Sequence, residues 1–184
     1  MAHLPSAPAH FRFCPRCAML LETVQIEDKP RRACPACGYV HFTDPKVGVG
    51  VLVLSAGRVL LVQRKMAPGV GKWSLPAGFL DHGDDPQATA EREVLEETNL
   101  RVRAERLLGV FHNPHALTEG GASLFVLYRA RLLGGRLRPG DDAGAAAFFA
   151  PDELPELAFA STQAAIGAWL ADLPEAADSP GKPG

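Results

Sequence analysis

Three glutamates lie close together in one short segment, and their spacing is the feature of this chain that most directly suggests chemistry. The segment Arg92-Glu93-Val94-Leu95-Glu96-Glu97 predicts a helix, on which the three glutamates fall within an arc of about 100°. Like charges four residues apart destabilise an isolated helix by roughly 0.2–0.5 kcal/mol. Hard divalent cations bind carboxylate oxygens, and Mg²⁺ commonly bridges carboxylates and substrate phosphates. The spacing therefore indicates either a divalent metal site or a solvated acidic helix face.

The remainder of this predicted helix is apolar enough to face a core. The residues on the remaining arc, which are expected to point inward, are Ala88, Ala90, Val94 and Leu95. Asp85 followed by Pro86 predicts the start of the helix, with the aspartate as N-cap and the proline at the first helical position.

The stretch from Gly78 to Leu100 resembles the Nudix box, Gly-x5-Glu-x7-Arg-Glu-U-x-Glu-Glu-x-Gly-U, where U is a bulky aliphatic residue. The matching residues are Gly78, Arg92, Glu93, Val94, Glu96, Glu97 and Leu100. The preceding residues 73–78, Trp-Ser-Leu-Pro-Ala-Gly, resemble the W-x-x-P-G-G approach of Nudix proteins. The chain is thereby identified as a member of the Nudix hydrolase family.

Two positions depart from the box. Asn99 stands where the family has its second glycine, and asparagine is the next best residue for the left-handed conformation that ends a helix. Asp84 stands where the family has its first glutamate, which mainly braces the helix arginine. Asp84 is one methylene shorter than glutamate and is expected to reach Arg92 with a small shift. The sequence leaves the effect of both departures on activity open.

The resemblance implies the chemistry and the residues that perform it. Nudix enzymes hydrolyse the pyrophosphate bond of a nucleoside diphosphate linked to another group, and Mg²⁺ or Mn²⁺ stabilises the charge on the phosphoryl oxygens. The catalytic residues implied are Arg92, Glu93, Glu96 and Glu97. The three glutamates are also the implied metal ligands, together with the carbonyl of Gly78. The resemblance does not fix the number of catalytic metal ions.

Candidate substrate contacts lie beyond the box. Glu119, in the polar loop 113–121, is either the general base, a role that varies within the family, or a solvated loop charge. Phe111 and His115 are candidates to stack on a base or to bind phosphate, although a single histidine is more often a surface or packing residue.

All four cysteines lie near the N-terminus in two CxxC pairs. Cys14 and Cys17 form the first pair, Cys34 and Cys37 form the second, and residues 18–33 separate them. This is the spacing of a zinc ribbon, in which four thiolates close a tetrahedral shell around Zn²⁺. The alternatives are two disulfides or free thiols. A closed shell has no open coordination position, so the zinc is expected to be structural.

Length and composition bound the class of protein. The chain has 184 residues, of which 47% are hydrophobic, and a net charge of −2. This allows one ordinary domain with a small attachment and gives no electrostatic reason to expect nucleic acid or an anionic membrane as a partner. We find neither the apolar run of a signal peptide nor a membrane-spanning stretch, so a cytoplasmic protein is expected. Many Nudix enzymes are dimers, and the resemblance allows a homodimer.

Alternating and apolar runs predict the elements that position these residues. Strands are expected at 19–24, 33–42, 47–54, 59–64, 107–112, 122–132 and 145–149, and a C-terminal helix at 161–173. Gly48 and Gly50 fit a strand interior with a close backbone approach better than a phosphate-binding loop, because no helix follows them. The expected fold is the α/β/α sandwich on a mixed sheet of the Nudix family. The expected domains are a zinc ribbon at 11–44, the hydrolase at 45–173 and a disordered tail at 174–184.

Two groups of Nudix proteins carry a zinc ribbon. NADH pyrophosphatases have a signature close to SQPWPFPxS beyond the box, and nothing between Leu100 and Gly121 resembles it. The second group, which includes plant enzymes acting on FAD and ADP-ribose, is similar to this chain at 111–115, 128–131 and 157–162. ADP-ribose or a dinucleotide such as FAD or NADH is therefore the favoured substrate. The alternatives are a nucleotide sensor without turnover and a house-cleaning pyrophosphatase for nucleoside triphosphates.

Overall fold

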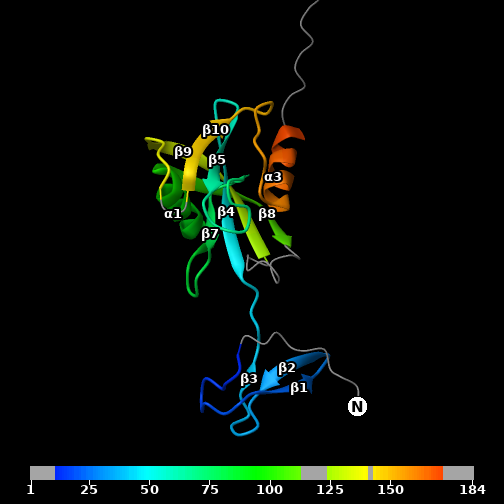
Figure 1. The fold of residues 1–184 in the computed structure, drawn as a ribbon. Helices are drawn as coiled ribbons and strands as arrows, with labels where there is room; N and C mark the ends of the chain where they lie inside the picture. The colour runs from blue at the N-terminus through cyan, green and yellow to red at the C-terminus, as the bar shows by residue number, and fades with distance from the viewer. Residues whose placement is uncertain (1–10, 113–123, 141–142, 172–184) are drawn as a thin grey trace, which may run out of the picture. The chain divides into compact units, whose positions relative to one another are not determined.

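The computed structural model describes residues 11–112, 124–140 and 143–171, and its chain divides into two compact units, Met1–Asp44 and Pro45–Gly184. Figure 1 traces both units along the chain. Within the described residues, neither helix is long and apolar enough to cross a membrane. The expected disordered tail, 174–184, lies outside the described residues.

The first unit is a small antiparallel sheet in the order β1-β2-β3. Its strands are β1 (Glu22–Ile26), β2 (Lys29–Ala33) and β3 (Val40–His41). The strands expected at 19–24 and 33–42 are therefore partly wrong. Residues 34–39 connect β2 to β3 through a turn at 35–37, and this turn brings Cys34 and Cys37 close together. A small core of Cys14, Leu21 and Cys34 supports the sheet.

The second unit is built on a seven-stranded mixed sheet. Its strands are β4 (Val47–Ser55), β5 (Arg58–Arg64), β6 (Trp73–Ser74), β7 (Ala77–Phe79), β8 (Leu100–His112), β9 (Leu124–Gly135) and β10 (Ala143–Phe149). The main path runs β10-β5-β4-β9-β8, with β6 beside β5 and β7 beside β4. Only the β4–β9 pair is parallel among the described pairs.

One helix covers each face of this sheet, so the expected α/β/α sandwich is confirmed. Helix α1 (Pro86–Thr98) and helix α3 (Ala160–Ala171) lie on opposite sides of the strands in Figure 1. The alternating residues of β4 explain the two cores. Val51 packs with Val94 of α1, whereas Leu52 packs with Ile166 of α3.

Of the four residues of α1 expected to face the core, Ala90 and Val94 are buried and the other two are not. Ala88 and Leu95 were expected to point inward, but both are exposed, and Leu95 retains 45% of its accessible surface. The buried residues are Thr89, Ala90, Val94 and Thr98. Positions four apart share one side of a helix, and Ala88 and Leu95 lie roughly 100–120° around the axis from Val94.

Strand β8 is much longer than the expected strand at 107–112. Leu100, Val102 and Ala104 are buried, and the charged residues between them are exposed, which is the alternation of a half-buried strand. Bulges interrupt its pairing with β9. Strands β6 and β7 are too short for their residues to have predicted them.

Gly48 and Gly50 lie inside β4, which confirms the strand interpretation over a phosphate-binding loop. A Cβ atom on Gly50 would collide with the ring of Phe125 on the neighbouring strand β9. Glycine at position 50 therefore allows an aromatic ring to lie directly on the backbone of β4.

Candidate functional site

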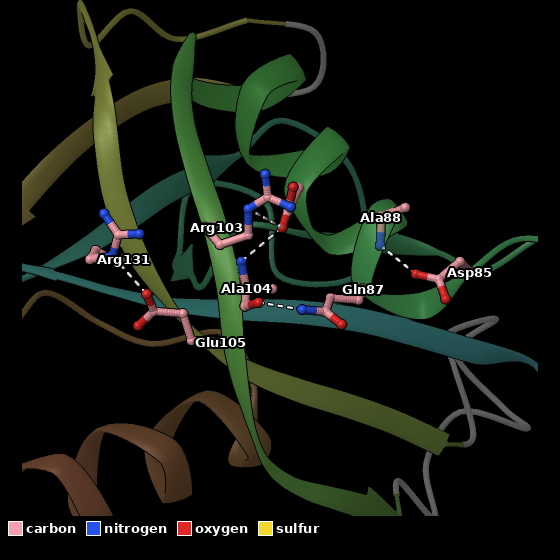
Figure 2. Close-up of polar contacts among 8 residues, drawn as sticks. Asp85, Gln87, Ala88, Arg103, Ala104, Glu105 and Arg131 are labelled. Atoms are coloured by element: carbon pink, nitrogen blue, oxygen red, sulfur yellow. Dashed lines mark hydrogen bonds and ion pairs between the residues drawn. The ribbon is translucent and has the colours of Figure 1, made fainter.

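Helix α1 begins as its sequence predicts. The side chain of Asp85 accepts a hydrogen bond of 2.8 Å from the backbone N–H of Ala88, and Pro86 is the first helical residue. Figure 2 shows this cap at the start of the helix. Asn99 ends the helix with φ 56°, the left-handed conformation expected for it.

Side chains of α1 also bind the backbone of β8, a contact that the sequence did not reveal. Glu91 Oε1 accepts a hydrogen bond of 2.9 Å from the Ala104 N–H and lies 3.7 Å from the Nε of Arg103. The Gln87 amide donates to the Ala104 carbonyl, and Figure 2 shows this side chain reaching from the helix to the strand. These bonds fix the side of α1 that faces away from the box glutamates.

The box glutamates Glu93 and Glu97 lie against β7. Glu97 Oε2 accepts a hydrogen bond of 3.0 Å from the Ala77 N–H. A Cβ atom on Gly78 would collide with the carboxylate of Glu93, whose side chain is 15% exposed. Glycine at position 78 is therefore a steric requirement of this site, because a larger residue would displace Glu93.

Arg92 lies between two carboxylates. Its Nη2 is 3.7 Å from Asp84 Oδ2 and 3.4 Å from Glu93 Oε1. The shorter Asp84 thus reaches the arginine, as expected. Arg92 and Asp84 are both partly exposed, so the contribution of this pair to stability is small. The main effect of Arg92, held by Asp84, is to restrict the orientation of the Glu93 carboxylate.

Glu96, the third box glutamate, is exposed. The three carboxylates share one helix face but do not converge as tightly as the four cysteines, which form the one close group of potential metal ligands found among the described residues. The donors nevertheless suit Mg²⁺ or Mn²⁺, because they are hard oxygens beside the polar backbone of β7.

Phe111, expected to contact substrate, lies in a row of aromatic residues that crosses four strands. It pairs with Phe125 in the register of β8 and β9, and both Phe125 and Phe79 pair with Gly48. Residues that pair across strands point to the same face of a sheet. Phe79, Phe125 and Phe111 therefore share the face of the sheet that α3 covers farther along the strands.

This row is accessible at its β7 end. Phe79 is 43% exposed, and the Nζ of Lys46 lies 3.9 Å from the centre of its ring. Aromatic faces beside a cation suit the planar base and the charge of a nucleotide. The sequence predicts only Phe111 of this row, because strand register decides which other rings lie beside it. The expected contacts His115 and Glu119 lie outside the described residues.

The four cysteines of the ribbon meet at one point. Their sulfur atoms all lie within 4.8 Å of one another. The Cys17–Cys34 pair is 3.5 Å apart, and the Cys14–Cys37 and Cys17–Cys37 pairs are each 3.6 Å apart. Four sulfurs around a zinc ion with Zn–S bonds of about 2.3 Å would be about 3.8 Å apart. All four are free thiols rather than disulfides. Their geometry and chemistry therefore fit a structural Zn²⁺.

The thiols differ in acidity. Burial acts to raise the pKa of Cys34, but hydrogen bonds from the backbone N–H groups of Cys37 and Ala36 and from neighbouring thiols lower it to about 7. A backbone hydrogen bond from Met19 acts to lower the pKa of Cys17, but the adjacent Cys34 and Cys37 sulfurs raise it to about 12. Metal binding to such a quartet releases protons.

The two cysteine turns have the same backbone design. Ala18 N–H donates to the Cys14 carbonyl at 2.9 Å, and Gly38 N–H donates to the Cys34 carbonyl at 3.0 Å. Ala18 has φ 60° and Gly38 has φ 72°. The second turn uses glycine for this left-handed position, whereas the first uses alanine, which is less favourable there.

Comparison with known proteins agrees with this geometry. The model of the NUDIX domain matches residues 44–170. An ADP-ribose pyrophosphatase from Methanocaldococcus jannaschii is 36% identical over 121 residues, which cover 66% of this chain and 71% of the relative. The crystal structure of a NUDIX hydrolase from Nitrosomonas europaea has a TM-score of 0.78 and 32% identity, covering 89% of this chain and 95% of its own.

A longer relative shares more of the chain. The NAD-capped RNA hydrolase NudC of Chromobacterium violaceum is 33% identical over 153 residues, which cover 79% of this chain. The match covers 52% of that relative, so this chain spans about half its length.

Proposed function

Because this chain belongs to the NUDIX family, we propose that it hydrolyses the pyrophosphate bond of a nucleoside diphosphate linked to another group, with ADP-ribose or a dinucleotide such as FAD or NADH as substrate. The observation that carries the proposal is the contact of α1 with β7. There Glu93 lies against the backbone of Gly78, and Glu97 is bonded to Ala77. Two partly buried carboxylates are thereby held beside the backbone of β7.

Each residue of this site has a proposed task. Glu93, Glu96 and Glu97, together with the carbonyl of Gly78, would hold Mg²⁺ or Mn²⁺, and Arg92 would orient Glu93. When bound, the metal supplies positive charge to the phosphoryl oxygens and acidifies the attacking water. Asp84 holds Arg92 from the other side. The chain thus supplies fixed negative charge where the cation binds.

The aromatic row supports a substrate with a nucleobase. Phe79 presents an exposed ring on the residue that follows Gly78, and Lys46 adds a positive charge above that ring. Phe79 and Gly78 are neighbours in β7 but face opposite sides of the sheet, so the diphosphate of a base stacked on Phe79 would have to pass around β7 to reach Glu93. ADP-ribose and FAD both contain adenine and a diphosphate, which is the combination that this arrangement can bind. The names of the relatives from Methanocaldococcus and Chromobacterium point to the same substrate class.

We propose that the ribbon binds one structural Zn²⁺ through Cys14, Cys17, Cys34 and Cys37. Its small core, Cys14, Leu21 and Cys34 with Tyr39, buries too little apolar surface to hold three short strands without a metal. Four free thiols also suit a reducing, cytoplasmic environment.

A substrate panel with identification of the products tests this function. The zinc-loaded protein is incubated with Mg²⁺ and ADP-ribose, FAD, NADH, NAD-capped RNA or a nucleoside triphosphate. Release of AMP from ADP-ribose or FAD supports the proposal. Pyrophosphate from the triphosphate alone indicates a house-cleaning enzyme, and tight binding without turnover indicates a nucleotide sensor. Preference for the capped RNA places the substrate among nucleic acids, contrary to the small-molecule partner that we expect.

A further inference from the structure

The last turn of α1, which carries Glu96 and Glu97, is held by the segment between β9 and β10. The Gly140 N–H donates a hydrogen bond of 3.0 Å to the Glu97 carbonyl. The Arg138 N–H donates one of 3.0 Å to the Thr98 carbonyl. The final carbonyls of a helix have no partners within the helix, so this segment satisfies two of them.

Asn99 adds a third bond to the same segment. Its Nδ2 donates to the Arg136 carbonyl at 2.9 Å, while its backbone N–H bonds back to the Leu95 carbonyl within the helix. Asn99 therefore ends the helix and also ties that end to the chain beyond β9. A glycine, which has no side chain, could end the helix in the same conformation but could not make this tie.

Gly140 is the closest point of the contact. A Cβ atom at this position would collide with the backbone carbonyl oxygen of Glu96. The φ of Gly140 lies outside the left-handed range, so backbone conformation does not demand glycine here. The requirement is steric: the segment must approach the helix closely enough for its N–H groups to reach the carbonyls.

We propose that residues 136–140 form a clamp that positions the glutamates of α1, and that Gly140 and Asn99 are positioning residues for catalysis. This inference rests on the proposed function, because it treats Glu96 and Glu97 as metal ligands. The clamp bonds the backbone carbonyls of Glu97 and Thr98 and lies close against the carbonyl of Glu96, while the Ala77 N–H donates to the carboxylate of Glu97. Gly140 and Asn99 would act through the helix backbone and not by contact with substrate or metal.

A substitution at Gly140 should act by displacing the end of α1 and not by unfolding the protein. A methyl group at position 140 forces the segment and the last helical turn apart by roughly 1 Å, the distance needed to relieve the collision. A displacement of that size in a catalytic site can lower the rate by about 100-fold. Buried residues one to two turns before the clamp contact, such as Ala90 and Val94, keep the helix on the sheet. The fold should therefore survive a change that disturbs the metal site.

The test compares Gly140→Ala and Asn99→Gly with Gly167→Ala. A Cβ atom at Gly167, on α3, would meet no atom within 4 Å, so this control makes the same chemical change in open space. We expect Gly140→Ala to lower kcat by about 10–100-fold and to weaken Mn²⁺ binding, followed by electron paramagnetic resonance of the zinc-loaded protein, with KM within about twofold of the parent. Asn99→Gly should act in the same direction by a smaller factor, and Gly167→Ala should change neither quantity.

Two outcomes would overturn the clamp. One is unchanged Mn²⁺ affinity and kcat in both clamp variants while both remain folded. The other is a loss of kcat that only tracks a loss of folded protein in the melting curve, which would reduce residues 136–140 to a structural role. If Gly140→Ala does not fold, Asn99→Gly decides by the same two measurements. If the parent binds Mn²⁺ at α1 but hydrolyses none of the panel, the proposed function fails while the Mn²⁺ titration still tests the clamp.

Discussion

At the scale of single residues, backbone contacts distinguish the glutamates of α1 from one another. Glu97 accepts from Ala77 of β7, whereas Glu91, on the other side of the helix, accepts from Ala104 of β8. Both carboxylates belong to one helix, yet only the first belongs to the face that carries the Nudix pattern. Glu91 and Glu97 carry the same charge, so their different roles follow from the direction in which each side chain points.

Replacing Glu97 with glutamine should lower kcat by roughly 100–1000-fold, because a charge is removed from the metal site while an oxygen remains to accept from Ala77. The Mg²⁺ dependence of turnover is measured alongside the melting temperature. Glu91→Gln is the matched control and should leave kcat unchanged, since its oxygen still accepts from Ala104. Equal losses in both variants, or full activity in Glu97→Gln, would show that this helix face is not the metal site.

Replacing Phe79 with leucine should raise KM for ADP-ribose or FAD by about tenfold, because stacking on an aromatic ring contributes roughly 1–3 kcal/mol per base. The kcat should change little, since this contact is the same in the ground state and the transition state. Phe13→Leu, which makes the same change at an exposed ring of the ribbon, should leave KM unaltered. An unchanged KM in Phe79→Leu would remove the aromatic row from substrate binding.

At the scale of elements, two cysteine turns of the same design differ in one residue. Ala18 adopts a left-handed conformation that alanine disfavours, at the position that Gly38 occupies in the second turn. The first turn therefore stores backbone strain that the second avoids. The hydrogen bonds from these residues to Cys14 and Cys34 keep each turn tight despite that difference.

Ala18→Gly should stabilise the zinc-loaded ribbon by about 0.5–1 kcal/mol, because it removes the strain of a Cβ atom at positive φ. Gly38→Ala should destabilise the ribbon by about 1 kcal/mol, because it places a Cβ atom at a residue with positive φ. Calorimetric unfolding of the two variants measures both effects. A loss of stability in Ala18→Gly would mean that the methyl group of Ala18 makes contacts worth more than the strain.

At the scale of the whole molecule, two units with different sources of stability share one chain. The unit Pro45–Gly184 has apolar cores on both faces of its sheet, whereas the described core of Met1–Asp44 contains little beyond Cys14, Leu21 and Cys34. The larger unit is held by apolar burial, whereas the smaller is proposed to depend on the Zn²⁺ that its four thiols would bind. The two should therefore respond differently to loss of metal.

A zinc-selective chelator, added in excess Mg²⁺, should abolish the melting transition of the ribbon and leave that of the larger unit in place. Cys34→Ser should reproduce this profile without chelator, since it removes one of four ligands. Differential scanning calorimetry and zinc content are the measurements. Lost turnover with an unchanged melting profile would assign the ribbon a role other than structural support.

The sequence predicted the parts of this protein that depend on local spacing. The cap at Asp85, the left-handed Asn99 and the gathering of the four cysteines follow from residues near one another in the chain, and all are confirmed. Contacts that depend on strand pairing and on the path of the chain could not be predicted from the sequence. The row of Phe79, Phe125 and Phe111 depends on register across four strands, and the approach of Gly140 to Glu96 depends on where the chain returns after β9.

The bonds from Gln87 and Glu91 to Ala104 also protect the molecule from joining its neighbours strand to strand. β8 ends the described strand order, and an uncovered terminal strand is a template for amyloid-like growth. At Ala104 both backbone groups are already occupied by side chains of α1, and bulges disturb the strand nearby. An incoming chain would have to displace α1 before it could pair with β8 at Ala104. We therefore expect the protein to resist aggregation through this strand, even at high concentration, for as long as α1 stays packed on the sheet.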